Sequence, residues 1–522
     1  MRSTTPPSLR AAFLALLSCL AAWGQATDLT PTEADLRAAD CRRIAQLTVH
    51  DYSILSAEFV DATDRTPARC RVLGVLPPEI VFHVVLPVVW NGRILMTGNG
   101  GYGGTPPNAP GRLRQADRIA SDGFVAVNTN TGHDRRAEPL ASFALNNRQK
   151  EIDFGFRAVH LTIQTAKELT ALYYGREADY SYWESCSTGG RQGLMEAQRF
   201  PDDFDGIIVG APVVDHTTSE IWGAWNAKAL EEAPISLEQV GLVAEAVYDR
   251  CDSLDGLEDG LLDDPRVCDF DPARDLPRCV DSGSDGCFSD AEVATLKKLY
   301  GGVVSRGTTL FPGLPLGAEA SPPGRRRAQS GWRGWVINEN GPSWQLEFAE
   351  SFLRYMAFEP DDPDYDWRSF DFDSDPYKMD FIRSVLDPTD PDLTPFRDAG
   401  GKMLMYFGWA DTGVNPLMGV NYYEEVQRVS GPDADEYFRL FMVPGMFHCA
   451  GGLGVSRVDY RKALIDWVEA GQAPDRLVGA RLIGGQTEMT RPLCPYPEVA
   501  RYDGAGDPNS AESFTCVSPP PR

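Results

Sequence analysis

The chain has 522 residues, of which 43% are hydrophobic and 24% charged, a globular rather than a disordered or fibrous composition, and it is long enough to bury a large core. Its 49 basic and 75 acidic side chains give a formal net charge of −26, which argues against nucleic acid or an anionic membrane as a partner. No apolar run approaches the roughly 18 residues that a membrane-spanning helix needs, so no membrane span is predicted.

Residues 1–26 have the pattern of a signal peptide. A basic start is followed by the apolar run 11–20 and by Gly24-Gln25-Ala26, which places small residues around a cleavage site after Ala26. The alternatives are a first core helix, or a lipoprotein, because Leu17-Ser18-Cys19 loosely resembles a lipidation box. The prediction is a secreted or periplasmic protein, with a lipid anchor as the less favoured alternative.

Short β-branched runs alternate with helical patterns in the first half of the chain. Strands are predicted at 80–86, 93–97, 124–128 and 206–209. A helix is predicted over 151–174, ending at Gly175. Such alternation predicts an α/β fold with a mostly parallel sheet covered by helices.

The composition and the hydrophobic pattern of the sequence change after Pro212. Asp-rich, Gly/Pro-rich and acidic stretches follow one another, and strand patterns return at 402–407 and 439–443, before a helix at 460–470. We therefore expect a core in two parts, residues 27–212 and 397–522. Residues 213–396 are expected to form an inserted domain over the carboxyl edge of the sheet.

The most informative stretch runs from Ser185 to Gly190. A strand-like run leads into Cys186-Ser187-Thr188-Gly189-Gly190, and a helix pattern follows. A nucleophile elbow needs a sharp strand-to-helix turn with small residues two before and two after the serine, and Ser185 and Gly189 occupy those places. The alternative is an ordinary helix cap, for which Ser and Gly are common.

A serine nucleophile needs a base and an orienting acid. Asp411 follows the strand at 402–407, and His448 lies in a Pro/Gly loop after the strand at 439–443. The order Ser187, Asp411, His448 is that of an α/β-hydrolase triad. Of the other histidines, His83 and His160 are more typical of a core. His133 or His216 could line a cleft.

The Gly-rich segment 98–104 follows another predicted strand. Backbone N–H groups of Gly100 and Gly101 could hold an oxyanion there, with the N–H of Thr188 as the second donor. The alternatives are a surface turn, or a phosphate loop, which lacks its closing Lys-Ser/Thr pair here.

Ten of the eleven cysteines remain after removal of the signal, and an even number after an export signal predicts five disulfides. Close spacing favours the pairs Cys251–Cys268, Cys279–Cys287 and Cys494–Cys516, over a zinc site for which no suitable spacing exists. A bond between Cys186 and Cys449 would tie the elbow to the histidine loop. The rival hypothesis, Cys186 as a thiolate nucleophile, needs a reduced thiol. The remaining cysteines expected in disulfides are Cys41 and Cys70.

Several motifs together resemble the tannase and feruloyl esterase family. They include Asp153-Phe154-Gly155-Phe156-Arg157, the Cys-Ser-Thr-Gly-Gly run from Cys186, Gly408-Trp409-Ala410-Asp411 and Pro444-Gly445-Met446-Phe447-His448-Cys449, within a match from about residue 90 to the C-terminus. The resemblance implies an α/β-hydrolase core with a large inserted lid domain. It also implies Ser187, Asp411 and His448 as the triad, beside a Cys186–Cys449 disulfide.

The resemblance further implies a structural calcium ion in the lid. Its ligands would be the carboxylates of Asp252, Asp255 and Asp259 and the backbone carbonyls of Leu257 and Leu261. Three carboxylates within a short glycine-containing segment suit a hard cation, although the spacing is not that of an EF-hand. Without the resemblance, a solvated acidic loop is the favoured interpretation.

Two residues depart from the family pattern. Ser185 replaces the usual glycine before the nucleophile, and Phe407 stands where the family often has histidine. Neither change removes a reacting group, so we expect them to affect substrate fit more than activity.

The sequence therefore predicts a serine carboxylic-ester hydrolase that forms an acyl-enzyme from aromatic acid esters of feruloyl or galloyl type, attached in nature to cell-wall polysaccharide or tannin. A terephthalate monoester is the nearest alternative. A calcium-dependent binding module without activity and a serine peptidase are alternatives of other classes. Six aromatic residues of the insertion could be core or could line an acyl pocket: Trp332, Trp335, Trp344, Phe348, Phe352 and Tyr355.

Overall fold

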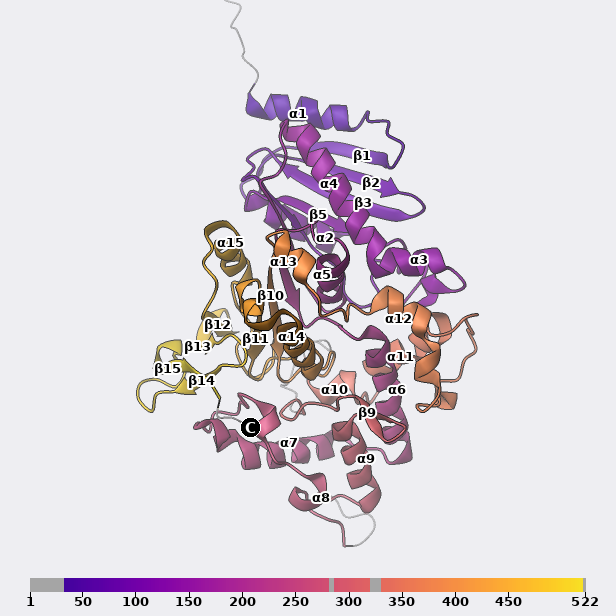
Figure 1. The fold of residues 1–522 in the computed structure, drawn as a ribbon, viewed down its shortest axis with the longest axis vertical. Helices are drawn as coiled ribbons and strands as arrows, with labels where there is room; N and C mark the ends of the chain where they lie inside the picture. Colours follow the sequence, from indigo (N-terminus) through magenta and orange to yellow (C-terminus); the bar gives the residue numbers. More distant parts are fainter. Residues whose placement is uncertain (1–31, 281–285, 320–329, 520–522) are drawn as a thin grey trace, which may run out of the picture.

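The structure is a computed structural model that describes residues 32–280, 286–319 and 330–519 (Figure 1). The predicted signal peptide, residues 1–26, lies outside the described residues. Within the described ranges, no helix combines the length and apolar character needed to cross a bilayer.

A nine-stranded sheet organises the chain, in the order β1-β2-β3-β5-β4-β6-β7-β10-β11 (Figure 1). From β5 to β11 in this order neighbouring strands are parallel, whereas β1, β2 and β3 pair antiparallel, so the mostly parallel α/β sheet is confirmed. The predicted strands are present to within one residue at each end. The nine strands are β1 (Ser53–Val60), β2 (Arg69–Leu76), β3 (Ile80–Pro87), β4 (Arg93–Met96), β5 (Val125–Thr129), β6 (Tyr180–Cys186), β7 (Gly206–Gly210), β10 (Lys402–Gly408) and β11 (Phe438–Val443).

Helices cover both faces of the sheet, because successive side chains of a strand point to opposite faces. Val84 and Ile207 pack into one buried cluster, and their neighbours Val85 and Ile208 pack into another. The helices of the first cluster are α4 (Ala158–Tyr174), α5 (Thr188–Arg199) and α14 (Pro416–Ser430), and those of the second are α2 (Pro110–Ser121) and α15 (Tyr460–Ala470).

The helix predicted over 151–174 is interrupted. The chain forms α3 (Arg148–Ile152), a π-helical turn at Asp153–Arg157 and then α4, which ends at Gly175 with φ 74°. The buried Arg191 donates hydrogen bonds to the carbonyls of Phe154 and Gly155, 3.1 and 3.0 Å away. These tertiary bonds take carbonyls from the regular helical ladder, so a π turn replaces the predicted continuous helix.

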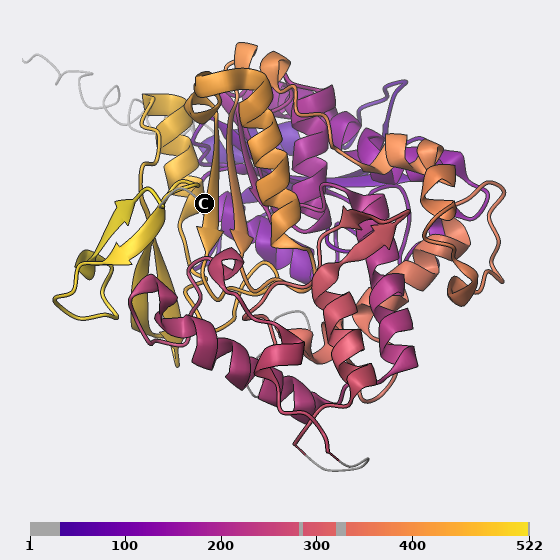
Figure 2. The same cartoon turned by 60° about the horizontal axis from the view of Figure 1, so that its bottom comes forward.

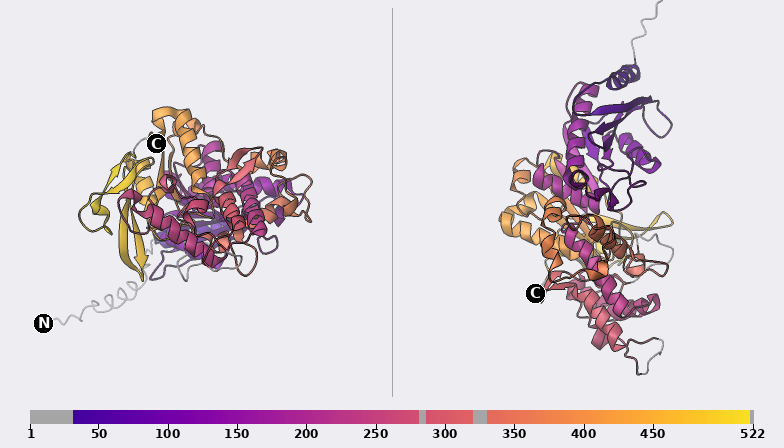
Figure 3. Two further views of the ribbon diagram at one scale, coloured as in Figure 1. Left: turned by 90° about the horizontal axis from the view of Figure 1, so that it is seen from below. Right: turned by 90° about the vertical axis from the view of Figure 1, so that its right-hand side faces the viewer.

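The chain between β7 and β10 leaves the sheet and returns to it. It carries helices and a separate two-stranded sheet. Its helices within residues 237–275 and 290–301 lie at the end of the molecule opposite α1 (Glu33–Ile44), whereas those within residues 380–398 lie beside α3 and α5 (Figures 1 and 3). Its elements are α6 (His216–Glu232), α7 (Leu237–Cys251), α8 (Pro272–Asp275), α9 (Asp290–Gly301), β8 (Val303–Ser305), β9 (Thr308–Phe311), α10 (Trp332–Trp335), α11 (Trp344–Tyr355), α12 (Asp380–Leu386) and α13 (Thr394–Asp398).

Two antiparallel pairs complete the C-terminal part and stand beside the main sheet (Figure 2). They are β12 (Leu477–Ile483) with β13 (Gln486–Leu493), and β14 (Val499–Tyr502) with β15 (Phe514–Val517). These four strands are not predicted from the sequence. Their side chains are mostly exposed or half-buried.

Five disulfides join all ten cysteines that the sequence predicts to be oxidised. The three short-range pairs and the Cys186–Cys449 bond are confirmed. The fifth disulfide, Cys41–Cys70, fastens α1 to β2, which pairs with β1 and β3 at the antiparallel side of the sheet.

Candidate active site

Ser187 occupies a sharp turn between β6 and α5. Its backbone has φ 66° and ψ −130°, a conformation that costs energy for any residue with a side chain. Its N–H donates to the Gly210 carbonyl, 2.9 Å away, which connects the turn to β7. A sharp strand-to-helix turn of this kind is the geometry expected of a nucleophile elbow.

The small residues around Ser187 are required by close packing. A Cβ at Gly189 would lie 2.0 Å from the Ser185 hydroxyl oxygen, and one at Gly190 would lie 2.5 Å from the Gly210 carbonyl. Both distances are too short for a real side chain. Because Gly189 has none, the elbow accommodates Ser185 at the position where the family has glycine.

Asp411 and His448 meet at the ends of β10 and β11. Asp411 Oδ2 lies 2.9 Å from His448 Nδ1, and Oδ1 accepts the N–H groups of Gly413 and Val414 at 2.8 and 2.9 Å. Asp411 is fully buried and His448 is 7% exposed. The aspartate is thus held in a position to orient the imidazole, as in a catalytic triad.

The Cys186–Cys449 disulfide joins the elbow directly to the histidine loop. Its Cα atoms are 6.0 Å apart, and Cys449 Sγ lies 3.6 Å from His448 Nε2. The second ring nitrogen of His448 therefore faces the elbow side of the site. A covalent link at this point restricts movement of the imidazole relative to Ser187, which is a form of preorganisation.

A cavity of about 620 Å³ lies over these residues. Ser187, Thr188 and His448 line it, and so do Gly100 and Gly101 of the predicted oxyanion loop. Of the six insertion aromatics, three line the cavity, Trp335, Trp344 and Phe348. The other three pack in or against the core: Trp332, Phe352 and Tyr355.

Phe407, the second departure from the family pattern, is not at the cavity. It is fully buried in β10, where a Cβ on Gly419 would lie 2.1 Å from its ring. We predicted an effect on substrate fit; this placement instead makes Phe407 a packing residue between β10 and α14.

Three polar residues at the cavity were not selected as site residues from the sequence. They are Tyr102, within the Gly-rich segment, and His216 and Glu220, one turn apart in α6. Burial raises the pKa of Glu220 to about 8 and lowers the pKa of His216 well below its usual range. Of these three residues, only His216 is considered in the sequence-based prediction, as one of two histidines that could line a cleft.

The Asp-rich segment after α7 folds back on itself. Asp252 accepts the N–H of Gly260 at 3.0 Å, Asp255 that of Leu257 at 3.0 Å, and Asp259 that of Leu261 at 3.2 Å. Burial, together with the charges of Asp259 and Asp252, raises the pKa of Asp255 to about 6. Crowded carboxylates of this kind are the chemistry that a hard cation would relieve, so the residues present fit calcium.

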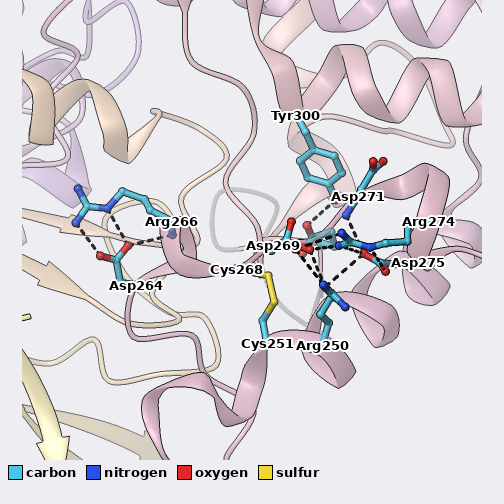
Figure 4. The surroundings of a disulfide bond; sticks show 11 residues. Arg250, Cys251, Asp264, Arg266, Cys268, Asp269, Asp271, Arg274, Asp275 and Tyr300 are labelled. Carbon is cyan, nitrogen blue, oxygen red and sulfur yellow. Dashed lines mark hydrogen bonds and ion pairs between the residues drawn. A yellow bond between two sulfur atoms is a disulfide. The ribbon is translucent and has the colours of Figure 1, made fainter. Parts of the chain in front are cut away.

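The neighbouring acidic residues are already paired. The Cys251–Cys268 disulfide holds both ends of the segment, and beyond it Arg250 and Arg274 bind Asp269 and Asp275 (Figure 4). A second cavity, of about 710 Å³, lies between this segment and β14. Three aspartates of the Asp-rich segment line it, Asp255, Asp263 and Asp264.

One group of three side chains in the described part of the chain could hold a metal ion by closeness alone: His160, Glu196 and Asp203, whose ligand atoms lie within 4.8 Å of one another. His160 Nδ1 is 2.7 Å from Asp203 Oδ2. Glu196 is fully buried, and burial together with the charge of Asp203 raises its pKa well above the usual range. A proton retained on Glu196 thus allows its carboxyl to lie close to Asp203 without repulsion between two negative charges. None of the three lines the Ser187 cavity.

Comparison with known proteins gives a consistent result. A family model described as tannase and feruloyl esterase matches residues 65–517. The chain is 35% identical to a mono(2-hydroxyethyl) terephthalate hydrolase from Piscinibacter sakaiensis, over 87% of this chain and 85% of that protein. It is 32% identical to feruloyl esterase B from Aspergillus niger, over 83% and 82%. The crystal structure of feruloyl esterase B from Aspergillus oryzae superposes with a TM-score of 0.80 at 28% identity, covering 92% of this chain and all of that one.

Proposed function

The chain belongs to the tannase and feruloyl esterase family, and on that premise we propose that it hydrolyses esters of aromatic carboxylic acids through an acyl-enzyme on Ser187. The observation that carries this proposal is the meeting of three segments at one cavity. The strained Ser187 elbow, the buried Asp411–His448 pair and the disulfide that joins them come from distant parts of the chain.

In the first half of the reaction His448 accepts the proton of the Ser187 hydroxyl as the oxygen attacks the ester carbonyl. Asp411 holds the imidazole and stabilises its positive charge. His448 then gives the proton to the departing alcohol. In the second half, a water activated by His448 releases the aromatic acid and restores Ser187.

The oxyanion of the tetrahedral intermediate would be held by backbone N–H groups. Thr188 is the first residue of α5, where N–H groups have no partner within the helix. Gly100 and Gly101 border the same cavity from the other side. Each such donor contributes on the order of 3–4 kcal/mol to transition-state stabilisation.

The nature of the acyl group follows from the cavity walls. Three aromatic side chains from the insertion, Trp335, Trp344 and Phe348, face the Ser187 side and favour a planar ring. A feruloyl or galloyl ester is the first candidate, with polysaccharide or tannin as the natural carrier. A terephthalate monoester is the second, because the guanidinium-bearing Arg135 also lines the cavity and could pair with a free carboxylate.

The test is hydrolysis of methyl ferulate, methyl gallate and mono(2-hydroxyethyl) terephthalate, measured side by side with an anilide of ferulic acid. We expect turnover of at least one of the three esters and none of the anilide. Turnover of the anilide alone would indicate a peptidase. A protein that retains its disulfides and calcium but hydrolyses none of them would contradict the esterase assignment.

We further propose a structural calcium ion bound by Asp252, Asp255 and Asp259 with the backbone carbonyls of Leu257 and Leu261. The ion would fasten the segment between α7 and α8, and so the insertion, rather than take part in the reaction. The raised pKa of Asp255, to which burial and the charges of Asp259 and Asp252 contribute, supports this proposal.

Removal of calcium is expected to lower the melting temperature at neutral pH. At a calcium concentration of 100 times the Kd, binding contributes about 2.7 kcal/mol to the free energy of unfolding. Without a cation, the raised pKa of Asp255 gives a stabilising contribution that is complete below pH 3.8 and lost as pH rises through about 6. Calcium needs the ionised form, so the difference in melting temperature with and without chelator should be larger at pH 8 than at pH 5.

Differential scanning calorimetry with and without EGTA measures this response. Asp255→Asn should abolish it, whereas Asp269→Asn, just beyond the segment, exposed and paired with arginines, should retain it. Equal responses in the two variants would contradict the proposed ligand set.

We also infer export to the periplasm or the cell exterior. Five disulfides support this inference, because disulfides persist in oxidising compartments. N-terminal sequencing of the exported protein should begin at residue 27.

A further inference from the structure

A buried polar group lies in the wall of the Ser187 cavity, which three aromatic side chains of the insertion also line. His216 is 2% exposed, and neither of its ring nitrogens has a hydrogen-bond partner within the described structure. Its Nε2 lies 3.5 Å from Glu220 Oε1, which is longer than a normal hydrogen bond. Polar atoms buried without a partner are costly, so such a pair calls for an explanation.

Tyr102 adds a third polar atom at the same place. Its hydroxyl donates to the Phe348 carbonyl at 3.2 Å, and its ring centroid lies 5.8 Å from that of His216. Tyr102 is the residue after Gly101 of the predicted oxyanion loop, and all three polar side chains line the cavity that Ser187 opens into. The group therefore shares one cavity with the reacting atoms.

The protonation of these side chains decides what they can bind. Glu220, with its pKa near 8, keeps its proton at neutral pH, and His216 is neutral because burial disfavours its charged form. The group then presents both hydrogen-bond donors and acceptors but no net charge. A hydroxyl, itself both donor and acceptor, matches it better than a carboxylate, which only accepts and which needs a cation when buried.

Resting on the proposed ester hydrolysis, we propose that His216, Glu220 and Tyr102 form a subsite that binds a hydroxyl group on the aromatic ring of the acyl group. The hydroxyl would hydrogen-bond from the cavity side to both His216 Nε2 and the Glu220 carboxyl, whose facing atoms are 3.5 Å apart. Trp335, Trp344 and Phe348 would contact the ring. The subsite thus selects phenolic over unsubstituted acyl groups.

The experiment compares kcat/KM for methyl 4-hydroxycinnamate and methyl cinnamate, which differ by one ring hydroxyl. A site built to hydrogen-bond a hydroxyl rejects the analogue that lacks it, so we expect a ratio of about ten or more for the unmodified protein. His216→Phe and Glu220→Leu should bring the ratio close to one. Glu220→Gln, which keeps a neutral group with donor and acceptor, should preserve most of it.

Glu350→Leu is the matched control, since Glu350 lies on α11 outside the cavity lining and pairs with Arg354. It should leave the ratio unchanged. Hydrolysis of p-nitrophenyl acetate, whose acyl group has no ring, reports on the triad separately. If that ester is hydrolysed but the two cinnamates are turned over equally, the subsite is wrong and the esterase stands. If none of the three esters is hydrolysed, both proposals are overturned.

Discussion

Replacing Ser187 with alanine is expected to lower ester hydrolysis by at least about 10³-fold while leaving the fold intact. The change removes the hydroxyl that would attack the ester carbonyl. Alanine keeps a side chain of similar size at the strained elbow, where φ is 66°, so the turn between β6 and α5 should persist. Initial rates on the best ester of the panel, together with circular dichroism and a thermal melt, measure both parts of the prediction.

Ser121→Ala is a suitable control for the chemistry of the substitution. Ser121 is exposed at the end of α2 and its hydroxyl donates to the Asp117 carbonyl, away from the cavity. This variant should hydrolyse the ester at the rate of the unmodified protein. Near-normal turnover by the Ser187→Ala variant would end the serine mechanism.

Asp411→Asn is expected to lower kcat by about 10⁴-fold, because an amide cannot stabilise the imidazolium and favours the wrong tautomer of His448. The N–H groups of Gly413 and Val414 that Asp411 accepts should still find the amide oxygen. The loss should therefore fall on kcat rather than on KM or on the melting temperature.

Asp459→Asn provides the matched comparison. Asp459 caps α15, where asparagine caps equally well, and its carboxylate accepts the N–H of Lys462. We expect unchanged kinetics. A loss of kcat in Asp411→Asn no larger than in Asp459→Asn would remove Asp411 from the mechanism.

The residues of the proposed triad can be selected from the sequence because each follows a segment with a clear strand pattern. β6, β10 and β11 are short buried strands, and in a parallel sheet their carboxyl ends meet at one edge, which is where active sites of such folds lie. Cys186 and Cys449, which are adjacent to Ser187 and His448, independently indicate that these two residues lie close together, because the two cysteines form a disulfide.

The proposed polar subsite of His216, Glu220 and Tyr102 cannot be predicted from the sequence in the same way. His216 and Glu220 open a helix of the insertion, and Tyr102 lies in the Gly loop, more than a hundred residues earlier. Only the packing of α6 against α11 and the loop brings them together, and no local pattern records that packing. The π turn at Asp153–Arg157 was missed for a similar reason, since Arg191 from α5 causes it.

The most direct test of the account is covalent capture of the nucleophile. On treatment with a fluorophosphonate, the Ser187 oxygen should bond to phosphorus as the P–F bond of the reagent breaks, releasing one fluoride and the hydroxyl proton per chain. Mass spectrometry of the digested protein should place the adduct on the peptide that holds Ser187. The account predicts one adduct per chain, lost in Ser187→Ala, with ester hydrolysis falling in proportion to labelling. An adduct on another residue, or full hydrolysis by the labelled protein, would contradict the central claim.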